Sequence, residues 1–133
     1  MQVTFDCADP PALGAFWAGV LRYPAPDMAA WHERLRQLGM PEEQLDNWCR
    51  IEDPDQVRPT LFFQRVPEPK AVKNRVHLDV RAPRDGDAER QTQVDGEVAR
   101  IVALGGRRIR DVTDEDGYFV VMQDPEGNEF CID

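Results

Sequence analysis

The fold is first indicated by a stretch near the end of the chain, Asp124-Pro125-Glu126-Gly127-Asn128-Glu129-Phe130. Aspartate, proline, glycine and asparagine, which make up most of its first half, are residues that favour turns. The stretch lies between two runs of strand-forming residues, 118–123 and 129–132. We therefore predict two strands joined by a turn, which is a typical unit of a β-sheet.

The features of this stretch occur a second time, about half a chain earlier. Gln123-Asp124-Pro125-Glu126 matches Glu52-Asp53-Pro54-Asp55 at an offset of 71 residues. Val76-His77-Leu78-Asp79 matches Val3-Thr4-Phe5-Asp6 at an offset of 73 residues. Two landmarks in the same order and at nearly the same offset are typical of a duplicated module. The sequence therefore predicts an internal repeat.

The length of the chain agrees with two modules that form one domain. A chain of 133 residues can bury a proper core, whereas a module of roughly 65 to 70 residues is too small to bury a large one alone. We expect the first module at about 1–67 and the second at about 74–133. The connector, 67–73, is stiffened by its prolines.

The first module is predicted to begin with a strand and a helix. Residues 2–7 alternate as a strand does, and Asp9 followed by two prolines is a typical helix start. Apolar residues at helical spacing come after it. Further elements are expected as strands at 48–51 and 60–66 and a turn at 53–55, and a stub of strand at 23–26 is left open.

Residues 27–47 form an extra helical segment that the second module lacks. Asp27 is a typical helix start, and Trp31, Leu35 and Leu38 share one face of the short helix expected after it, which Gly39 ends. Trp31 and Trp48 flank the segment. We expect these two tryptophans to form a lid or an aromatic wall beside a ligand site.

The second module is predicted to repeat this order with a longer helix. The helix is expected over about 87–104, with Val94, Val98, Ile101 and Val102 on its buried stripe. The expected strands are 75–80, 108–112, 118–123 and 129–132. Each module is therefore βαββ, or βαβββ if residues 23–26 form a strand.

Charge and cysteine content exclude several classes of partner. Lys and Arg number 16 and Asp and Glu 25, so the net charge of −9 argues against binding to nucleic acid or to an anionic membrane. The apolar runs are too short to span a membrane, and the first nine residues do not resemble a secretory signal. Cys7, Cys49 and Cys131 are odd in number and lack a CxxC spacing, as expected in the reducing cytoplasm. We expect a cytoplasmic protein whose partner is a small molecule.

A helix covers one face of each predicted sheet and leaves the other face bare, so two such sheets are expected to curl into an open trough. Side chains at i and i+2 share a face of a strand. His77 therefore lies with Asp79, and Glu129 lies with Cys131. If Phe130 points toward the helix, these four side chains point into the trough.

The repeat gives the matching positions of the first module. Thr4 and Asp6 match His77 and Asp79, and an alignment of 61–64 with 128–131 adds Phe62 and Gln64. A shift of one residue in that alignment would replace Phe62 by Phe63 and reverse the face. The candidate ligand-binding residues are Thr4, Asp6, Phe62, Gln64, Asp79 and Cys131.

These features together resemble the vicinal oxygen chelate superfamily, which includes glyoxalase I, fosfomycin-resistance enzymes, extradiol dioxygenases and bleomycin-resistance proteins. The resemblance rests on the duplication, on the position of His77 and on residues 124–130, and it covers the chain apart from 27–47. A narrower similarity, to glyoxalase-like proteins of high-GC bacteria, rests on 63–70 and 73–79. The resemblance implies an α+β fold of tandem βαβββ modules, with a curved mixed sheet around an open trough, and a homodimer.

In metal-dependent members of that superfamily, the first and last strands of each module supply ligands to a divalent ion. The resemblance implies His77 and Glu129 as metal ligands here, with Glu129 also as the catalytic residue. Thr4 and Phe62 stand at the other two positions, and two protein ligands are one fewer than a catalytic metal site usually has. Gln64 or Asp6 offers a further oxygen, from one pleat away.

Two functions therefore stay open. The first is a metal-free trough that holds an aromatic or cationic small molecule against Phe62, with Asp6, Asp79 and Glu129 facing its positive groups. The second is a divalent-metal-dependent lyase, isomerase or oxygenase in which Glu129 is a metal ligand or moves a proton. The missing ligands of the first module favour the first function.

Overall fold

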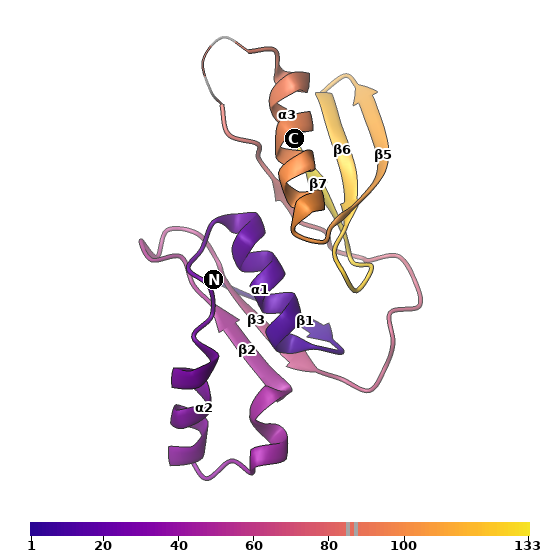
Figure 1. Cartoon of the computed structure of the whole chain (residues 1–133). Helices are drawn as coiled ribbons and strands as arrows, with labels where there is room; N and C mark the ends of the chain where they lie inside the picture. Colours follow the sequence, from indigo (N-terminus) through magenta and orange to yellow (C-terminus); the bar gives the residue numbers. More distant parts are fainter. Residues whose placement is uncertain (85, 87) are drawn as a thin grey trace. The chain divides into compact units, whose positions relative to one another are not determined.

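A computed structural model describes residues 1–84, 86 and 88–133 of the chain (Figure 1). The described chain divides into two compact units, Met1–Pro69 and Lys70–Asp133, and each unit has its own sheet. Both sheets are open and mixed, and helices accompany them, so the α+β class expected from the sequence is confirmed. No helix among the described residues combines the length and the apolar character needed to cross a membrane. The trough expected from the sequence stays a prediction.

The first unit contains three strands and three helices. Its helix α1 follows Asp9, whose side chain accepts a hydrogen bond from the backbone N–H of Ala12 (3.1 Å), as a helix N-cap does. Helix α1 ends at Arg22, which takes the left-handed conformation. The elements are β1 (Gln2–Cys7), α1 (Pro10–Leu21), α2 (Met28–Gln37), a 3₁₀ helix (Glu42–Asn47), β2 (Trp48–Ile51) and β3 (Thr60–Arg65).

The first sheet has the strand order β1-β3-β2, with β1 parallel and β2 antiparallel to β3. Helix α1 covers one face, where Leu13 and Trp17 are buried together with Phe63. On β3, Phe63 is fully buried while its neighbour Phe62 is half-buried. The structure therefore places Phe62, and not Phe63, on the face away from α1.

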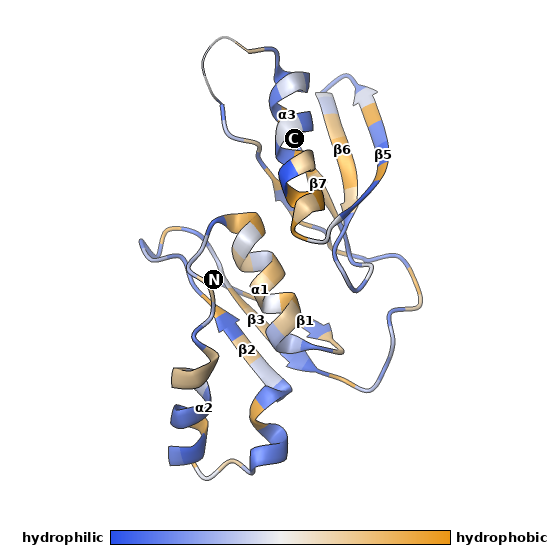
Figure 2. Cartoon of the chain, in the orientation of Figure 1, coloured by the Kyte–Doolittle hydropathy of each residue, from blue (hydrophilic) through white to orange (hydrophobic). Residues whose placement is uncertain are grey.

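The described residues of the second unit form four strands in the order β4-β7-β6-β5 and one helix. Helix α3 buries Val94, Val98 and Ile101 against this sheet. The apolar residues of β6 are visible as a continuous hydrophobic strand in Figure 2. The elements are β4 (Asp79–Val80), α3 (Arg90–Ala103), β5 (Arg107–Asp114), β6 (Gly117–Gln123) and β7 (Glu129–Ile132).

The strand expected at 75–80 is much shorter than predicted, because only Asp79–Val80 pairs with β7. The N–H group of Asn74 donates instead to the carboxylate of Glu129 (3.0 Å). The hydrogen-bond partner of the Asn74 N–H is therefore a side chain and not the backbone of a neighbouring strand. His77 lies just outside β4 as a result.

The expected helix at 87–104 is also shorter, since α3 begins at Arg90. Its expected start, Asp87, lies outside the described residues. Val102 was expected on the buried stripe and is 46% exposed, whereas Glu97 is 5% exposed. The side chain of Arg100 forms an ion pair with Glu97 (2.7 Å), so the buried charge has its partner.

The structure also separates Leu38 from the buried Leu35 and decides between the two alternatives for residues 23–26. Leu38 is 70% exposed, because α2 ends at Gln37 and Leu38 is its C-cap. Residues 23–26 form no strand, since Tyr23 is a buried anchor whose hydroxyl donates to the carbonyl of Pro59 (2.9 Å). The strands expected at 2–7, 48–51 and 129–132 have the bounds that were predicted.

The two units have matching sheet connections, as a duplication requires. Parallel pairing joins β1 to β3 in the first unit and β4 to β7 in the second. Asp6 lies opposite Gln64, and Asp79 lies opposite Cys131, in agreement with the alignment of the repeats. The second sheet continues into β5, and no strand of the described first unit corresponds to it.

Candidate functional site

The face of the first sheet that points away from α1 is called the first open face here, and it carries Thr4, Asp6, Phe62 and Gln64. None of its side chains is buried. Thr4 lies opposite Phe62, and Asp6 lies opposite Gln64. The side-chain amide of Gln64 donates a hydrogen bond to the carboxylate of Asp6 (2.7 Å). The four residues proposed from the sequence therefore come together, but the charge of Asp6 already has a partner.

Strand β2 adds Arg50 to the first open face. It lies opposite Phe62 in the sheet, and its guanidinium forms an ion pair with Glu52. Sequence reasoning did not single out Arg50, although it stands two residues after Trp48 and so shares a strand face with it. The alternation of β2 was the signal that could have found it.

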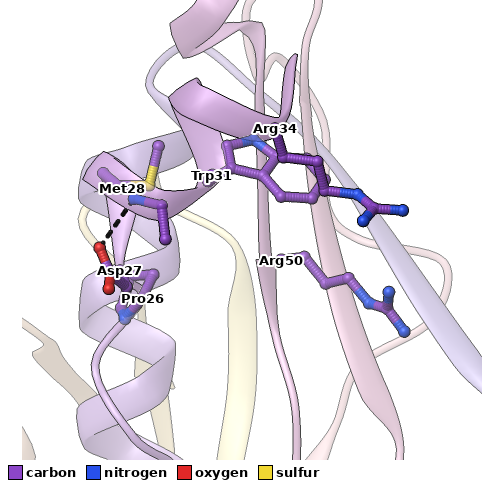
Figure 3. Close-up of a pocket in the computed structure, with 7 residues that line it drawn as sticks. Pro26, Asp27, Met28, Trp31, Arg34 and Arg50 are labelled. Atoms are coloured by element: carbon purple, nitrogen blue, oxygen red, sulfur yellow. Dashed lines mark hydrogen bonds between the residues drawn. The ribbon is translucent and has the colours of Figure 1, made fainter. Parts of the chain in front are cut away.

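A pocket of about 240 Å³ lies where helix α2 meets Arg50 (Figure 3). Trp31 lines it, as the sequence led us to expect, and the indole N–H of Trp31 donates to the backbone carbonyl of Trp48 (3.0 Å). The side chains of Arg34 and Arg50 point in the same direction beside the Trp31 ring. The pocket thus combines an aromatic ring with two guanidinium groups. Its lining residues are Pro26, Asp27, Met28, Ala30, Trp31, Arg34 and Arg50.

In the second unit the structure brings His77, Asp79 and Cys131 together. The ring nitrogen Nε2 of His77 lies 3.3 Å from the carboxylate of Asp79, and ligand atoms of all three residues lie within 4.8 Å of one another. His77 and Asp79 are exposed, whereas Cys131 is buried. Burial, with a further contribution from Asp79, raises the pKa of the Cys131 thiol to about 11.

Glu129 has partners of its own. Its carboxylate oxygen Oε2 accepts hydrogen bonds from the backbone N–H of Asn74 (3.0 Å) and from the ammonium of Lys70 (3.2 Å). Burial alone would raise the pKa of Glu129, but the backbone hydrogen bonds of Asn74 and Glu129, together with Lys70, lower it below its ordinary value. Glu129 is therefore an ionised carboxylate at neutral pH and is suited to accept a proton rather than to donate one.

The residues at the four metal positions of the vicinal oxygen chelate type do not fit a metal. Phe62 has no ligand atom, and Thr4 offers a neutral hydroxyl that divalent ions seldom take as a ligand. Glu129 is held by Lys70 and Asn74, and His77 lies against Asp79. A site of that type would therefore have too few free ligands.

Comparisons with known proteins agree with this fold. The family model described as glyoxalase-like domain matches residues 2–132 of the chain. None of the curated protein sequences matches this chain.

Several solved structures share the fold over nearly the whole chain. A glyoxalase/bleomycin resistance protein/dioxygenase family enzyme from Burkholderia phytofirmans PsJN is 17% identical with a TM-score of 0.64, and the match covers 98% of this chain and 94% of that one. A glyoxalase-related enzyme from Fulvimarina pelagi is 16% identical with a TM-score of 0.62, covering 98% and 84%. The fosfomycin resistance protein FosX from Listeria monocytogenes is 11% identical with a TM-score of 0.62, covering 99% and 88%. At these identities the similarity shows a common fold.

Proposed function

The chain belongs to the glyoxalase-like domain family, and from this premise we propose that it binds a small aromatic molecule on its first open face, without the help of a metal ion. The observation that carries the proposal is the half-buried ring of Phe62 on a sheet face that α1 leaves uncovered. Small-molecule sites combine apolar and aromatic side chains with a few polar groups, and Phe62 with its polar neighbours supplies both kinds.

The charges around Phe62 support an aromatic ligand that is neutral or anionic. Asp6 is hydrogen-bonded by Gln64, so it offers less to a cation than the sequence led us to expect. Arg50 is the neighbour of Phe62 on β2 and also lines the pocket beside Trp31. A ring stacked on Phe62 can therefore extend a carboxylate or another acidic group toward Arg50, where it competes with Glu52 for the guanidinium.

Tryptophan fluorescence offers a direct test, because Trp31 and Trp48 lie beside the proposed site. We expect saturable changes with aromatic carboxylates, weaker changes with neutral amides of the same size, and none with the matching aromatic amines. Replacement Phe62→Ala should weaken binding about tenfold or more, since a buried aromatic contact contributes more than about 1.4 kcal/mol.

A matched control is available in the second unit. Phe119 is half-buried on β6, so Phe119→Ala removes a similar ring from a different sheet and should leave binding unchanged. A chelator should also leave binding unchanged. Equal loss in both phenylalanine variants, or no response across the panel of ligands, would overturn the proposal.

A second candidate is a divalent-metal-dependent lyase, isomerase or oxygenase in which His77 and Glu129 hold the ion. It is supported by the second module, which keeps a residue suited to each of its two ligand positions. The contacts of Glu129 with Lys70 and Asn74 make it the weaker candidate. Stoichiometric metal in the purified protein that is lost in both His77→Ala and Glu129→Gln would favour it.

We also propose that the chain forms a homodimer, as its resemblance to vicinal oxygen chelate proteins implies. Val72 and Val76 support this, because their side chains are 72% and 76% exposed and offer apolar surface to a second copy. Analytical ultracentrifugation at micromolar concentration should show a dimer, and Val76→Asp should weaken it. A monomeric wild-type chain would refute the proposal.

A further inference from the structure

We propose that His77, Asp79 and Cys131 form a binding site for a divalent transition-metal ion, with Zn²⁺ as the best match. This site lies within the second module and differs from the pair His77 and Glu129 considered above. It is independent of ligand binding on the first open face. The argument rests on the geometry of the three side chains and on the charge around them.

The local backbone explains why the three side chains converge. Asp79 and Cys131 are direct partners in the parallel pairing of β4 with β7, so their side chains leave the sheet side by side. His77 lies two residues before Asp79, just outside β4, and its ring nitrogen Nε2 faces the Asp79 carboxylate. The result is the separation of 3.3 Å between His77 Nε2 and an Asp79 oxygen, with the Cys131 sulfur within 4.8 Å of both.

These distances and donor types suit zinc. Zinc binds cysteine sulfur at about 2.3 Å and histidine nitrogen or carboxylate oxygen at about 2.0 to 2.2 Å, which places ligand atoms of a tetrahedral site roughly 3 to 4 Å apart. The three residues supply one sulfur, one nitrogen and one oxygen, a mixture that magnesium and calcium avoid. Three protein ligands leave the fourth position open to water or to a small molecule.

A further carboxylate adds negative charge at the same place. Asp133 follows Cys131 by two residues, on the same side of the chain. Within the described part of the molecule, its oxygen Oδ1 is buried and has no hydrogen-bond partner. A buried carboxylate oxygen without a donor is costly, and a cation bound nearby lowers that cost.

Exposure of two of the ligands gives an ion access to the site. The side chains of His77 and Asp79 are 45% and 62% exposed, whereas Cys131 is 8% exposed. The ion can therefore arrive from solvent, where it displaces the contact between His77 and Asp79 and the hydrogen bond between Cys131 and Asp79. Glu129 is not needed, because Lys70 and Asn74 already hold its carboxylate.

Titration of the metal-free protein with Co²⁺ tests the site, because a bond from cobalt to a thiolate gives a charge-transfer band in the near ultraviolet that nitrogen and oxygen ligands do not. We expect one equivalent of cobalt to give this band and Zn²⁺ to abolish it by competition. Cys131→Ser should remove the band, and His77→Ala or Asp79→Asn should weaken cobalt binding at least about tenfold.

Two control variants separate this site from the alternatives. Cys7→Ser removes a buried thiol of the first unit and should leave the band intact. Glu129→Gln should leave it intact as well. Loss of cobalt binding in Glu129→Gln but not in Asp79→Asn would assign the metal to the pair His77 and Glu129 and overturn the proposal. A wild-type protein that gives no charge-transfer band, or a band that persists in Cys131→Ser, would also overturn it, whatever the outcome of the fluorescence titrations with Phe62→Ala.

Discussion

Asp53 and Asp124 occupy matching places in the two modules, and each is a buried carboxylate that holds a turn together. Asp53 accepts hydrogen bonds from the backbone N–H and from the guanidinium of Arg58. Asp124 accepts them from the backbone N–H and from the side-chain amide of Asn128. In both modules the aspartate, in place of water, accepts hydrogen bonds from the N–H groups of a turn. The last strand of each module follows that turn.

Removal of the Asp124 carboxylate should destabilise the protein. Asp124 is fully buried and Asn128 half-buried, so Asp124→Ala leaves the partly buried donors of Asn128 without their partner. We expect the free energy of unfolding to fall by about 2 to 4 kcal/mol, since each unsatisfied buried donor costs about 1 to 3 kcal/mol. Urea denaturation followed by circular dichroism measures the change. As a control, Asp116→Ala removes an exposed aspartate from another turn and should change stability by less than about 0.5 kcal/mol.

Asp53 should contribute a pH-dependent part of the stability. Hydrogen bonds from the Arg58 side chain, and then from its backbone, lower the pKa of Asp53 from 3.8 to about 2. A group whose pKa is lower in the folded state stabilises the fold above its unfolded pKa, and this stabilisation is lost as the pH falls through the folded value. The stability difference between wild type and Asp53→Asn should therefore shrink as the pH is lowered from about 4 to about 2.

Acid titration of both proteins, with Asp55→Asn as the control for an exposed neighbour in the same turn, measures this difference. A difference between wild type and Asp53→Asn that stays constant over the same interval would show that the ion pair with Arg58 does not act on Asp53 as described.

Much of the fold could be predicted from the sequence because its signals are local. Asp9 and Asp27 both accept the expected N-cap hydrogen bond, from Ala12 and Ala30 respectively. Alternation gave the bounds of β1, β2 and β7 for the same reason. β4 is shorter than the strand expected at 75–80, and just before that range the side chain of Glu129 binds the backbone N–H of Asn74, 55 residues away. No local pattern indicates such a contact.

The face that the candidate residues share could be predicted from the sequence, but their contacts could not. Alternation placed Phe62 and Gln64 on one face, and the register of the sheet agrees. Alternation does not indicate which neighbouring group each polar side chain will bind. Asp6 accepts a hydrogen bond from Gln64, and Glu129 forms an ion pair with Lys70, so both carboxylates that looked available for a ligand already have a partner. Such pairings depend on long-range packing that a single sequence does not encode in any local pattern.

The buried thiols should be unreactive in the metal-free native protein. Burial raises the pKa of both Cys49 and Cys131 to about 11. At pH near 8 only about one such thiol in a thousand is ionised, compared with about one in four for an ordinary cysteine. Iodoacetamide labelling followed by peptide mass spectrometry should be slow at both positions and become rapid in urea. Rapid labelling of Cys131 in the folded chain would mean that its surroundings are more open than its burial indicates.

Gly14 should be intolerant of any side chain, because α1 approaches β2 closely at this point. A Cβ atom at Gly14 would lie 2.5 Å from the sulfur of Cys49, a separation at which the atoms overlap. We expect Gly14→Ala to lower the free energy of unfolding by about 1 to 3 kcal/mol, although alanine is the better helix former.

Gly96 provides the matched control, since it lies inside α3 and a Cβ there would meet nothing within 4 Å. Gly96→Ala should therefore stabilise the protein by about 0.5 to 1 kcal/mol. Removal of the obstructing sulfur in Cys49→Ala should reduce the cost of Gly14→Ala, which a double-mutant cycle measures as a coupling of about 1 kcal/mol or more. If Gly14→Ala stabilised the chain as Gly96→Ala is expected to, α1 would have to lie farther from β2 than the 2.5 Å between a Cβ at Gly14 and the Cys49 sulfur indicates.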